Sequence, residues 1–143
     1  MTPEGTRPHA PPSAVLHHRV PFGETDAGGV VFYPNYLRWF DRATHELFRS
    51  LGLPMKELHE KWSVLLPIVS VQANFRAPLH YDDEVEIHSE IAELSERSLK
   101  VAHRVVSGGT EVSSGWEIRG WVSVAGGEFK TQPIPAEIRQ RLT

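Results

Sequence analysis

Residues 23–41 read GETDAGGVVFYPNYLRWFD, and the rest of the chain is arranged around this stretch. A polar turn that carries Asp26 runs through a Gly-Gly pair into a short apolar segment that ends at Tyr33. Pro34 then opens a helical pattern, and the first turn of a helix presents unpaired backbone N–H groups and the positive end of the helix dipole. A carboxylate is therefore expected beside amides that can stabilise a negatively charged oxygen.

The segment from 34 to 51 is predicted to be the one long helix of the chain. The apolar residues that recur there at three- and four-residue steps are Tyr36, Phe40, Ala43, Leu47 and Leu51. Pro34 suits a first-turn position, Gly52 suits the position after the helix end, and Pro54 blocks continuation. About 18 residues give roughly 27 Å of helix. Residues 55–61 are expected to add a shorter helix.

After residue 67 the apolar pattern changes to a period of two, which is typical of strands with one buried face. Four such segments follow one another, at 68–77, 84–93, 97–107 and 111–125, with turn signals between them. In the last segment, the residues expected to share the apolar face are Val112, Trp116, Ile118, Val122 and Val124. Gly115 in the same segment indicates a bulge or a close approach of another chain segment.

An earlier strand is predicted at 15–22. The residues expected on its apolar face are Leu16, His18, Val20 and Phe22. Pro21 cannot donate a hydrogen bond to a neighbouring strand, which favours a position at the edge of the sheet.

The order of elements is therefore a strand, a long helix and then four or five antiparallel strands. A sheet with one apolar face needs a cover, and the single long helix is the only candidate. The predicted class is α+β, with an antiparallel sheet of about five or six strands wrapped around one long helix, which is the hotdog fold. We expect residues 15–143 to form one such domain that closes with a short helix, and residues 1–14, with four prolines, to be a disordered tail.

The composition argues against several classes of function. The 143 residues are 40% hydrophobic and 23% charged with a net charge of −3, without the basic excess that favours nucleic-acid binding. The absence of cysteine excludes disulfides, thiolate metal sites and a cysteine nucleophile. The eight histidines lack the spacing of a metal site, and no G-x-S-x-G motif occurs. No apolar run approaches the roughly 20 residues of a membrane span, and no signal-peptide core is present, so a cytoplasmic protein is expected.

Two blocks of sequence together resemble a known family. The first block, ETDAGGVVFYPNYLRWFD, is similar to the signature of the 4-hydroxybenzoyl-CoA thioesterase family of hotdog acyl-CoA thioesterases. That signature is an Asp, a small residue or two and Gly, an apolar pair, an aromatic residue, Tyr, then Pro or His, and Asn-Tyr at the helix start. The second block, PIVSVQANFRAPLHYDDEVEI at 67–87, continues the similarity, which covers residues 16–131.

The resemblance implies roles for five residues. Asp26 matches the catalytic carboxylate of the family, which attacks the thioester carbonyl or acts as base for the attacking water. Tyr33 matches the residue whose backbone N–H polarises that carbonyl, and Phe32 falls at a position that lines the acyl pocket. Asp41 matches a residue that meets the ring hydroxyl of the substrate, and Arg97 matches a basic residue near the nucleotide phosphates of CoA.

Two departures from the family pattern bear on these roles. Ser95 and Glu96 precede Arg97 where the hydroxybenzoyl enzyme is basic, so phosphate binding is expected to differ. The Tyr33-Pro34 pair is like that of the hydroxybenzoyl enzyme, but the related Tol-Pal-associated thioesterases have His at the position of Pro34, so that position supplies no second catalytic imidazole here.

Three of the assignments have a simpler structural alternative. Asp26 can be an ordinary turn residue, as Asp often is. Asp41 can be a surface carboxylate that pairs with Arg38 or His45 at helical spacing. Arg97 can be a solvated turn residue.

The resemblance implies hydrolysis of an acyl-CoA thioester to a free acid and CoA, without a metal or a cofactor, since CoA is part of the substrate. An aromatic, hydroxybenzoyl-type acyl group is expected, because Phe32, Pro34 and Asp41 follow that pattern. A short- or medium-chain aliphatic acyl-CoA is the alternative substrate. Two alternatives belong to other classes, a non-catalytic acyl-CoA binding protein and a dehydratase of the same fold. A dehydratase would need a His in the site, and no His occurs between residues 19 and 44. A homodimer or homotetramer is expected, with no nucleic-acid or membrane partner.

Overall fold

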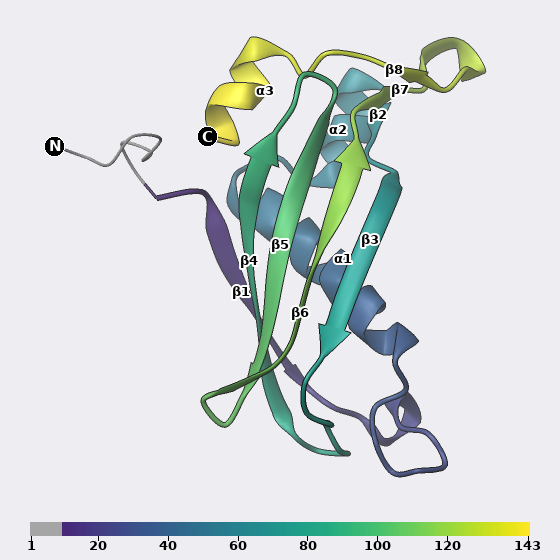
Figure 1. Cartoon of the computed structure of the whole chain (residues 1–143). Coiled ribbons are helices and arrows are strands. Elements are labelled where there is room, and N and C mark those ends of the chain that lie inside the picture. Colours follow the sequence, from purple (N-terminus) through teal and green to yellow (C-terminus); the bar gives the residue numbers. More distant parts are fainter. Residues whose placement is uncertain (1–9) are drawn as a thin grey trace, which may run out of the picture.

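A five-stranded antiparallel sheet wraps around one long helix in the computed structural model of the chain, which describes residues 10–143 (Figure 1). The strands are β1 (Ser13–Arg19), β3 (Ile68–Phe75), β4 (Glu84–Leu94), β5 (Ser98–Ser107) and β6 (Thr110–Gly120). They lie side by side in the order β1–β4–β5–β6–β3. The predicted hotdog architecture is therefore confirmed. The tail predicted at 1–14 falls mainly on residues 1–9, which lie outside the described part of the chain, but Ser13 and Ala14 belong to β1 and not to a tail.

Helix α1 (Pro34–Ser50) covers one face of this sheet, and its bounds agree with the predicted helix to within one residue. The large side chains that it buries are Tyr36, Trp39, Phe40, Leu47 and Phe48. Gly52 follows the helix with a φ of 73°, a left-handed conformation that Gly adopts without steric cost.

A second, smaller sheet closes the end of the molecule at which α1 ends (Figure 1). It has the order β2–β7–β8, with β2 at Val64–Leu65, β7 at Val122–Ser123 and β8 at Lys130–Thr131. Two short helices lie nearby, the predicted α2 (Met55–Trp62) and the predicted C-terminal α3 (Ala136–Arg141). The 3-10 turns η1 (Phe22–Glu24) and η2 (Ala125–Gly127) complete the elements. Among the helices described in residues 10–143, none combines the length and apolar character that crossing a membrane requires.

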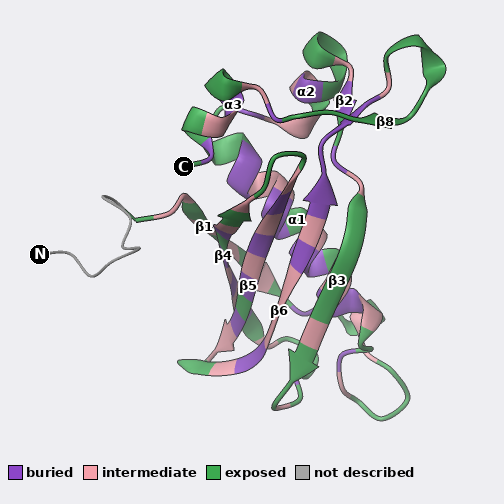
Figure 2. Cartoon of the chain, turned by 45° about the horizontal axis from the view of Figure 1, so that its top comes forward, coloured by how far each residue is buried: buried purple, intermediate pink, exposed green. Residues whose placement is uncertain are grey.

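The core lies between α1 and the sheet, in two clusters along the helix. The cluster near the helix start includes Trp39 and Ile87, both with no exposed surface. The cluster near the helix end includes Leu47 with Trp121 and Ile138, and so ties α1 to the small sheet and to α3. Figure 2 shows buried residues along α1, β5 and β6, whereas β3 is exposed along most of its length.

The buried face of β6 differs from the predicted one. Val112 and Val122 are buried as expected, but Trp116, Ile118 and Val124 are only partly buried. The side chains buried along this strand instead include Ser113, Glu117 and Arg119. The prediction for Trp116 and Ile118 was therefore wrong, and three polar residues take the place of the apolar ones.

A one-residue irregularity explains this error. Val105 pairs with Ser113, but the next residue, Val106, pairs with Glu111, so that Val112 is left as an extra residue in the ladder. A shift of one residue moves the side chains that follow to the opposite face of the sheet. Gly115 falls on the shifted inner face, where an added Cβ atom would overlap the Gln72 carbonyl, so its prediction as a close-approach point is confirmed.

The two edges of the large sheet differ in character. β1 is an edge strand, as Pro21 indicated, but it ends at Arg19, and Phe22 in the following turn is 75% exposed rather than on an apolar face. β3 forms the other edge and leaves Val69 64% and Phe75 50% exposed. The outer edge of β3 has no neighbouring strand in the described residues, and an edge with exposed apolar side chains is a surface that a second chain can cover.

Candidate active site

The loop that carries Asp26 holds its carboxylate by backbone amides. Asp26 Oδ1 accepts hydrogen bonds from the Gly28 N–H at 2.8 Å and the Val30 N–H at 3.4 Å. The Asp26 N–H in turn donates to the Val30 carbonyl at 2.9 Å, which closes the loop. The other carboxylate oxygen, Oδ2, has no hydrogen-bond partner among residues 10–143. One oxygen is thus fixed and the other is available.

The geometry of the loop favours glycine at both positions. A Cβ atom at Gly28 would lie 3.2 Å from Asp26 Oδ1, closer than ordinary van der Waals contact. Gly29 has a φ of 79°, in the left-handed region that other residues rarely adopt. The Gly-Gly pair therefore lets the backbone turn tightly around the carboxylate.

The start of α1 offers one free amide near this loop. The Phe32 N–H donates to the Glu24 carbonyl at 2.8 Å, and Pro34 has no N–H. Between them, the Tyr33 N–H has no acceptor in the described residues. It lies at the positive end of the α1 dipole, where a negatively charged oxygen is stabilised.

Glu24 anchors the loop to the start of α1. Its carboxylate accepts hydrogen bonds from His18 Nε2 at 2.8 Å and from Trp39 Nε1 at 3.1 Å. Its backbone carbonyl accepts one from Asn35 Nδ2 at 2.9 Å, besides the one from Phe32. These contacts join residues distant in sequence, and no local pattern in the sequence marks Glu24 or His18 as part of the site.

Exposed aromatic rings surround the start of α1. Phe32 is 49% and Tyr33 is 63% exposed, and their rings pack edge to face with centroids 5.3 Å apart. Phe75 of β3 packs on Tyr36 with centroids 4.9 Å apart. This is an apolar wall that one chain alone leaves open to solvent.

Asp41 lies two helical turns beyond Tyr33. Its Oδ1 accepts a hydrogen bond from Arg119 Nη2 at 2.7 Å and lies 3.6 Å from His45 Nε2. The Asp41 side chain is 47% exposed, whereas that of Arg119 is 4% exposed. The expected surface pairing with His45 is present, and Arg38 donates instead to Asn35.

Arg119 connects Asp41 to a buried polar cluster between the helix and the sheet. Glu117, with no exposed surface, accepts hydrogen bonds from Thr44 at 2.5 Å and from Arg119 Nη2 at 3.1 Å. His103 Nε2 lies 3.5 Å from Glu117. Burial raises the pKa of Glu117, but hydrogen bonds from His103 and Thr44 and the charge of Arg119 outweigh it, and the pKa falls from 4.5 to about 2. The sequence pattern missed this cluster because the irregularity in β6 conceals which face is buried.

Arg97 lies apart from the other predicted site residues. It follows β4 in the turn at the end of the sheet near β8 and α3, and its guanidinium donates to the Thr131 carbonyl at 3.0 Å. Figure 1 shows that end of the molecule opposite the loop before α1. A single chain therefore brings Asp26, Phe32 and Tyr33 together but leaves Arg97 remote.

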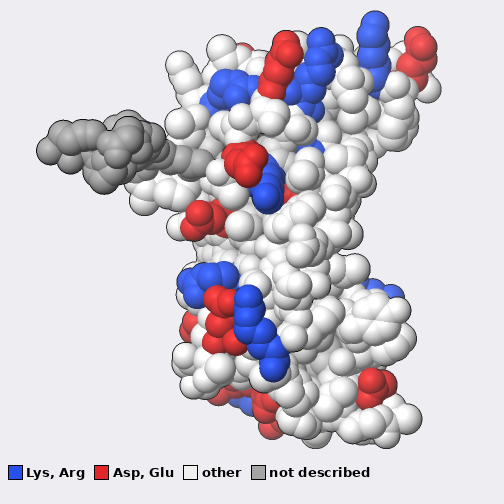
Figure 3. All heavy atoms as spheres, in the orientation of Figure 1, with Lys and Arg blue, Asp and Glu red and all other residues white. Residues whose placement is uncertain are grey.

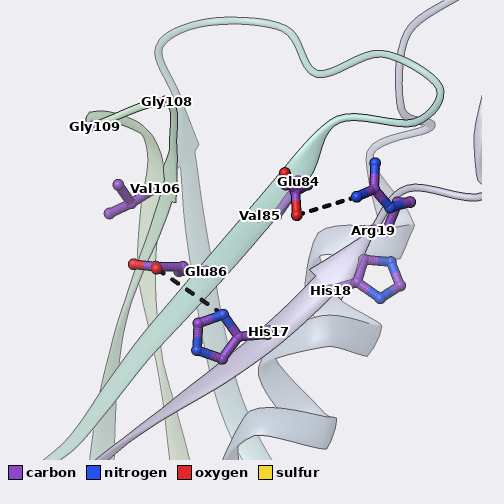
Figure 4. A pocket seen from close by; sticks show the side chains of 9 residues that line it. All are labelled: His17, His18, Arg19, Glu84, Val85, Glu86, Val106, Gly108 and Gly109. Atoms are coloured by element: carbon purple, nitrogen blue, oxygen red, sulfur yellow. Dashed lines mark ion pairs between the residues drawn. The ribbon is translucent and has the colours of Figure 1, made fainter.

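A cavity of about 560 Å³ between β1, β4 and the β5–β6 turn does not coincide with the predicted site (Figure 4). Its charged side chains pair with one another, Arg19 with Glu84 at 3.1 Å and His17 with Glu86 at 3.9 Å. On the face of the molecule in Figure 3, Lys and Arg lie next to Asp and Glu, and no broad patch of one sign is seen. No three His, Asp or Glu residues between positions 10 and 143 are placed to hold a metal ion.

Comparison with known proteins shows the family. A model of the thioesterase-like superfamily matches residues 20–142. A 4-hydroxybenzoyl-CoA thioesterase from Pseudomonas sp. (strain CBS-3) is 33% identical over 132 residues, which cover 87% of this chain and 94% of that protein. A 1,4-dihydroxy-2-naphthoyl-CoA hydrolase from Synechococcus sp. (strain WH7803) is 32% identical over 108 residues, covering 71% of each chain.

Solved structures share the same fold. A gentisyl-coenzyme A thioesterase has a TM-score of 0.83 at 39% identity, covering 91% of this chain and 100% of that chain. A variant of 4-hydroxybenzoyl-CoA thioesterase in complex with 4-hydroxybenzoyl-CoA has a TM-score of 0.85 at 30% identity, covering 92% of this chain and 99% of that chain. With its sheet, its central helix and nearly its whole length matched, this chain belongs to the thioesterase-like superfamily and is a hotdog-fold thioesterase of the 4-hydroxybenzoyl-CoA thioesterase family.

Proposed function

We propose that this enzyme hydrolyses an aromatic acyl-CoA thioester, with Asp26 as the catalytic carboxylate and the Tyr33 amide as the group that polarises the carbonyl. One observation carries the proposal. Asp26 has one oxygen fixed by the Gly28 and Val30 amides and the other without a partner in the described residues, on a loop that leads to the unpaired Tyr33 N–H.

The chemistry follows from these two groups. The Tyr33 N–H donates to the carbonyl oxygen of the thioester and stabilises the negative charge that develops there. Asp26 either attacks the carbonyl carbon, giving an anhydride that water then hydrolyses, or takes the proton from the attacking water. In both routes the carbon–sulfur bond breaks, CoA leaves as the thiol and the acyl group leaves as the free acid.

The position of Asp41 supports a hydroxylated aromatic acyl group. Tyr33, Leu37 and Asp41 follow one another at four-residue spacing along α1, so they lie on neighbouring turns of one side of the helix. The rise from Tyr33 to Asp41 is about 12 Å, a length that one aromatic ring spans with a hydrogen bond at each end. Phe32 supplies an exposed apolar ring next to Tyr33, at the start of this side of the helix. The relatives named above act on hydroxybenzoyl, gentisyl and dihydroxynaphthoyl thioesters of CoA.

A dimer would complete the site. Pairing of two β3 edges around a twofold axis would join the sheets and cover Val69 and Phe75. Because such strands pair antiparallel, the end of the sheet with Arg97 in one subunit would lie beside the Asp26 loop of the other. In this arrangement, Arg97 of one subunit could contact the phosphates of a CoA bound at Asp26 of the other.

A hydrolysis screen tests the acyl group. The purified enzyme is assayed with 4-hydroxybenzoyl-CoA, benzoyl-CoA and hexanoyl-CoA, and kcat/KM is expected to be about 10- to 100-fold higher for the hydroxylated ring than for benzoyl-CoA. Asp41→Ala should erase most of this preference and leave slow hydrolysis of both aryl substrates. Equal rates on the two aryl substrates, or a preference for hexanoyl-CoA, would refute the assignment of the acyl group but not of Asp26.

A further inference from the structure

The two oxygens of Asp41 have different surroundings. Oδ1 accepts the hydrogen bond from Arg119 at 2.7 Å and lies near His45. Oδ2 has no partner among residues 10–143. A carboxylate on the outer side of a helix would normally rotate freely in water, but Arg119 gives this one a fixed orientation and a single open acceptor.

Arg119 is itself fixed from the protein interior. Its Nε donates to Glu117 Oε1 at 3.2 Å, its Nη2 to Glu117 Oε2 at 3.1 Å, and its Nη1 to the Leu66 carbonyl at 3.0 Å. The guanidinium is a planar fork of donors, so three bonds to two partners set both its place and its plane. In this position, Arg119 Nη2 also donates to Asp41 Oδ1.

The inner end of this chain of contacts lies between α1 and the sheet. Glu117 is fully buried and accepts a further hydrogen bond from Thr44 of α1. Removing two charges from water is costly, and well-packed apolar residues often stabilise a core as well or better. The contacts from Glu117 to Arg119 and from Arg119 to Asp41 connect this buried charge to the surface of α1, where the proposed substrate lies.

We propose that Arg119, held by Glu117, is a positioning residue that sets selectivity for acyl groups with a neutral hydroxyl donor. The inference rests on the proposed function, in which Asp41 receives the acyl ring. Asp41 Oδ2 belongs to a carboxylate, which accepts hydrogen bonds and cannot donate them. A hydroxyl that donates to Asp41 Oδ2 is therefore favoured, and an anionic ring substituent such as a carboxylate is disfavoured.

Arg119→Lys tests this inference, because Lys keeps the charge but loses the planar fork. The ratio of kcat/KM for 4-hydroxybenzoyl-CoA to that for benzoyl-CoA is measured in the wild type and the variant. The wild-type ratio of about 10 to 100 should fall to within about threefold of unity in the variant. If Arg119 had a merely structural role, Arg119→Lys would lower kcat/KM for both substrates by the same factor and leave their ratio unchanged. Arg19→Lys, in the exposed Arg19–Glu84 pair of β1 and β4, is the matched control and should keep the wild-type ratio.

A double mutant separates positioning from other effects. In an Asp41→Ala background, Arg119→Lys should change the ratio no further, because the residue through which it acts is gone. Glu117→Gln provides a second variant if Arg119→Lys does not fold, and its ratio should also fall. A wild-type ratio in both Arg119→Lys and Glu117→Gln would overturn the inference and leave the proposed function intact. A wild-type enzyme without preference would overturn the role of Asp41 in the proposed function, and this inference with it.

Discussion

At the scale of single residues, Glu117 shows how one buried charge depends on its neighbours. The pKa of Glu117 lies near 2 because Thr44, His103 and Arg119 together outweigh the effect of burial. A carboxyl whose pKa is lower in the folded than in the unfolded chain stabilises the fold above the unfolded value. That contribution is lost as the pH falls from about 4.5 towards about 2.

The lowered pKa of Glu117 predicts that the free energy of unfolding depends on pH. Between about pH 4.5 and pH 2 the wild type should lose about 3 kcal/mol of unfolding free energy through Glu117 alone. Glu117→Gln should lack that part of the slope, as measured by denaturant unfolding at several pH values. Glu86→Gln, in the half-exposed Glu86–His88 pair at 2.8 Å, should retain it. Identical slopes in the wild type and Glu117→Gln would show that Glu117 is not ionised in the core.

Glu24 is the residue that we expect to position the catalytic loop. Its carboxylate and carbonyl tie the loop to His18, Trp39 and Asn35. Glu24→Gln weakens the bond with His18, and we expect kcat to fall by about 10-fold, since small misplacements of a catalytic group are costly. Steady-state kinetics with one acyl-CoA measures this, and Glu86→Gln, which alters another Glu–His contact of 2.8 Å, serves as the comparison. Equal kcat values for Glu24→Gln and the wild type would contradict the role of this anchor.

At the scale of elements, the long helix could be predicted almost to the residue, but β6 could not. The spacing of Tyr36, Phe40, Ala43 and Leu47 at three- and four-residue steps extends over about three turns, so a change at one position does not remove the pattern. In β6 a single extra residue, Val112, reverses the faces, and no composition signal marks its place. The same irregularity concealed Glu117 and Arg119, which sequence reasoning had not linked to Asp41.

The candidate site was accessible to sequence reasoning only in part. Asp26 and Tyr33 are close along the chain, and the Gly-Gly pair between them indicates a tight turn that can be predicted from the local sequence. The contacts of Glu24 and Arg119 join segments far apart in the chain, such as Arg119 to Asp41. Pairings of this kind depend on how the helix lies on the sheet, which a local pattern does not specify.

At the scale of the whole molecule, the exposed β3 edge predicts assembly. We expect no active monomer at micromolar concentration, because one chain leaves Arg97 remote from Asp26. Val69→Lys places a charge on the β3 edge, where Val69 is 64% exposed, and should shift the protein to monomers in sedimentation velocity. Val15→Lys on the opposite edge, where Val15 is 44% exposed, should leave the assembly unchanged. A fully active wild-type monomer would contradict the shared site.

The turnover of Asp26→Asn tests whether Asp26 is the catalytic carboxylate. The amide keeps the shape and the hydrogen bond to the Gly28 N–H, but it can neither attack a carbonyl nor take a proton from water. With the best substrate of the screen, we predict a fall in kcat of at least about 10²-fold, with the fold and the Kd for substrate retained. Glu60→Gln, an exposed carboxylate on α2, should turn over like the wild type. Turnover of Asp26→Asn close to that of the wild type would show that Asp26 is not the catalytic carboxylate.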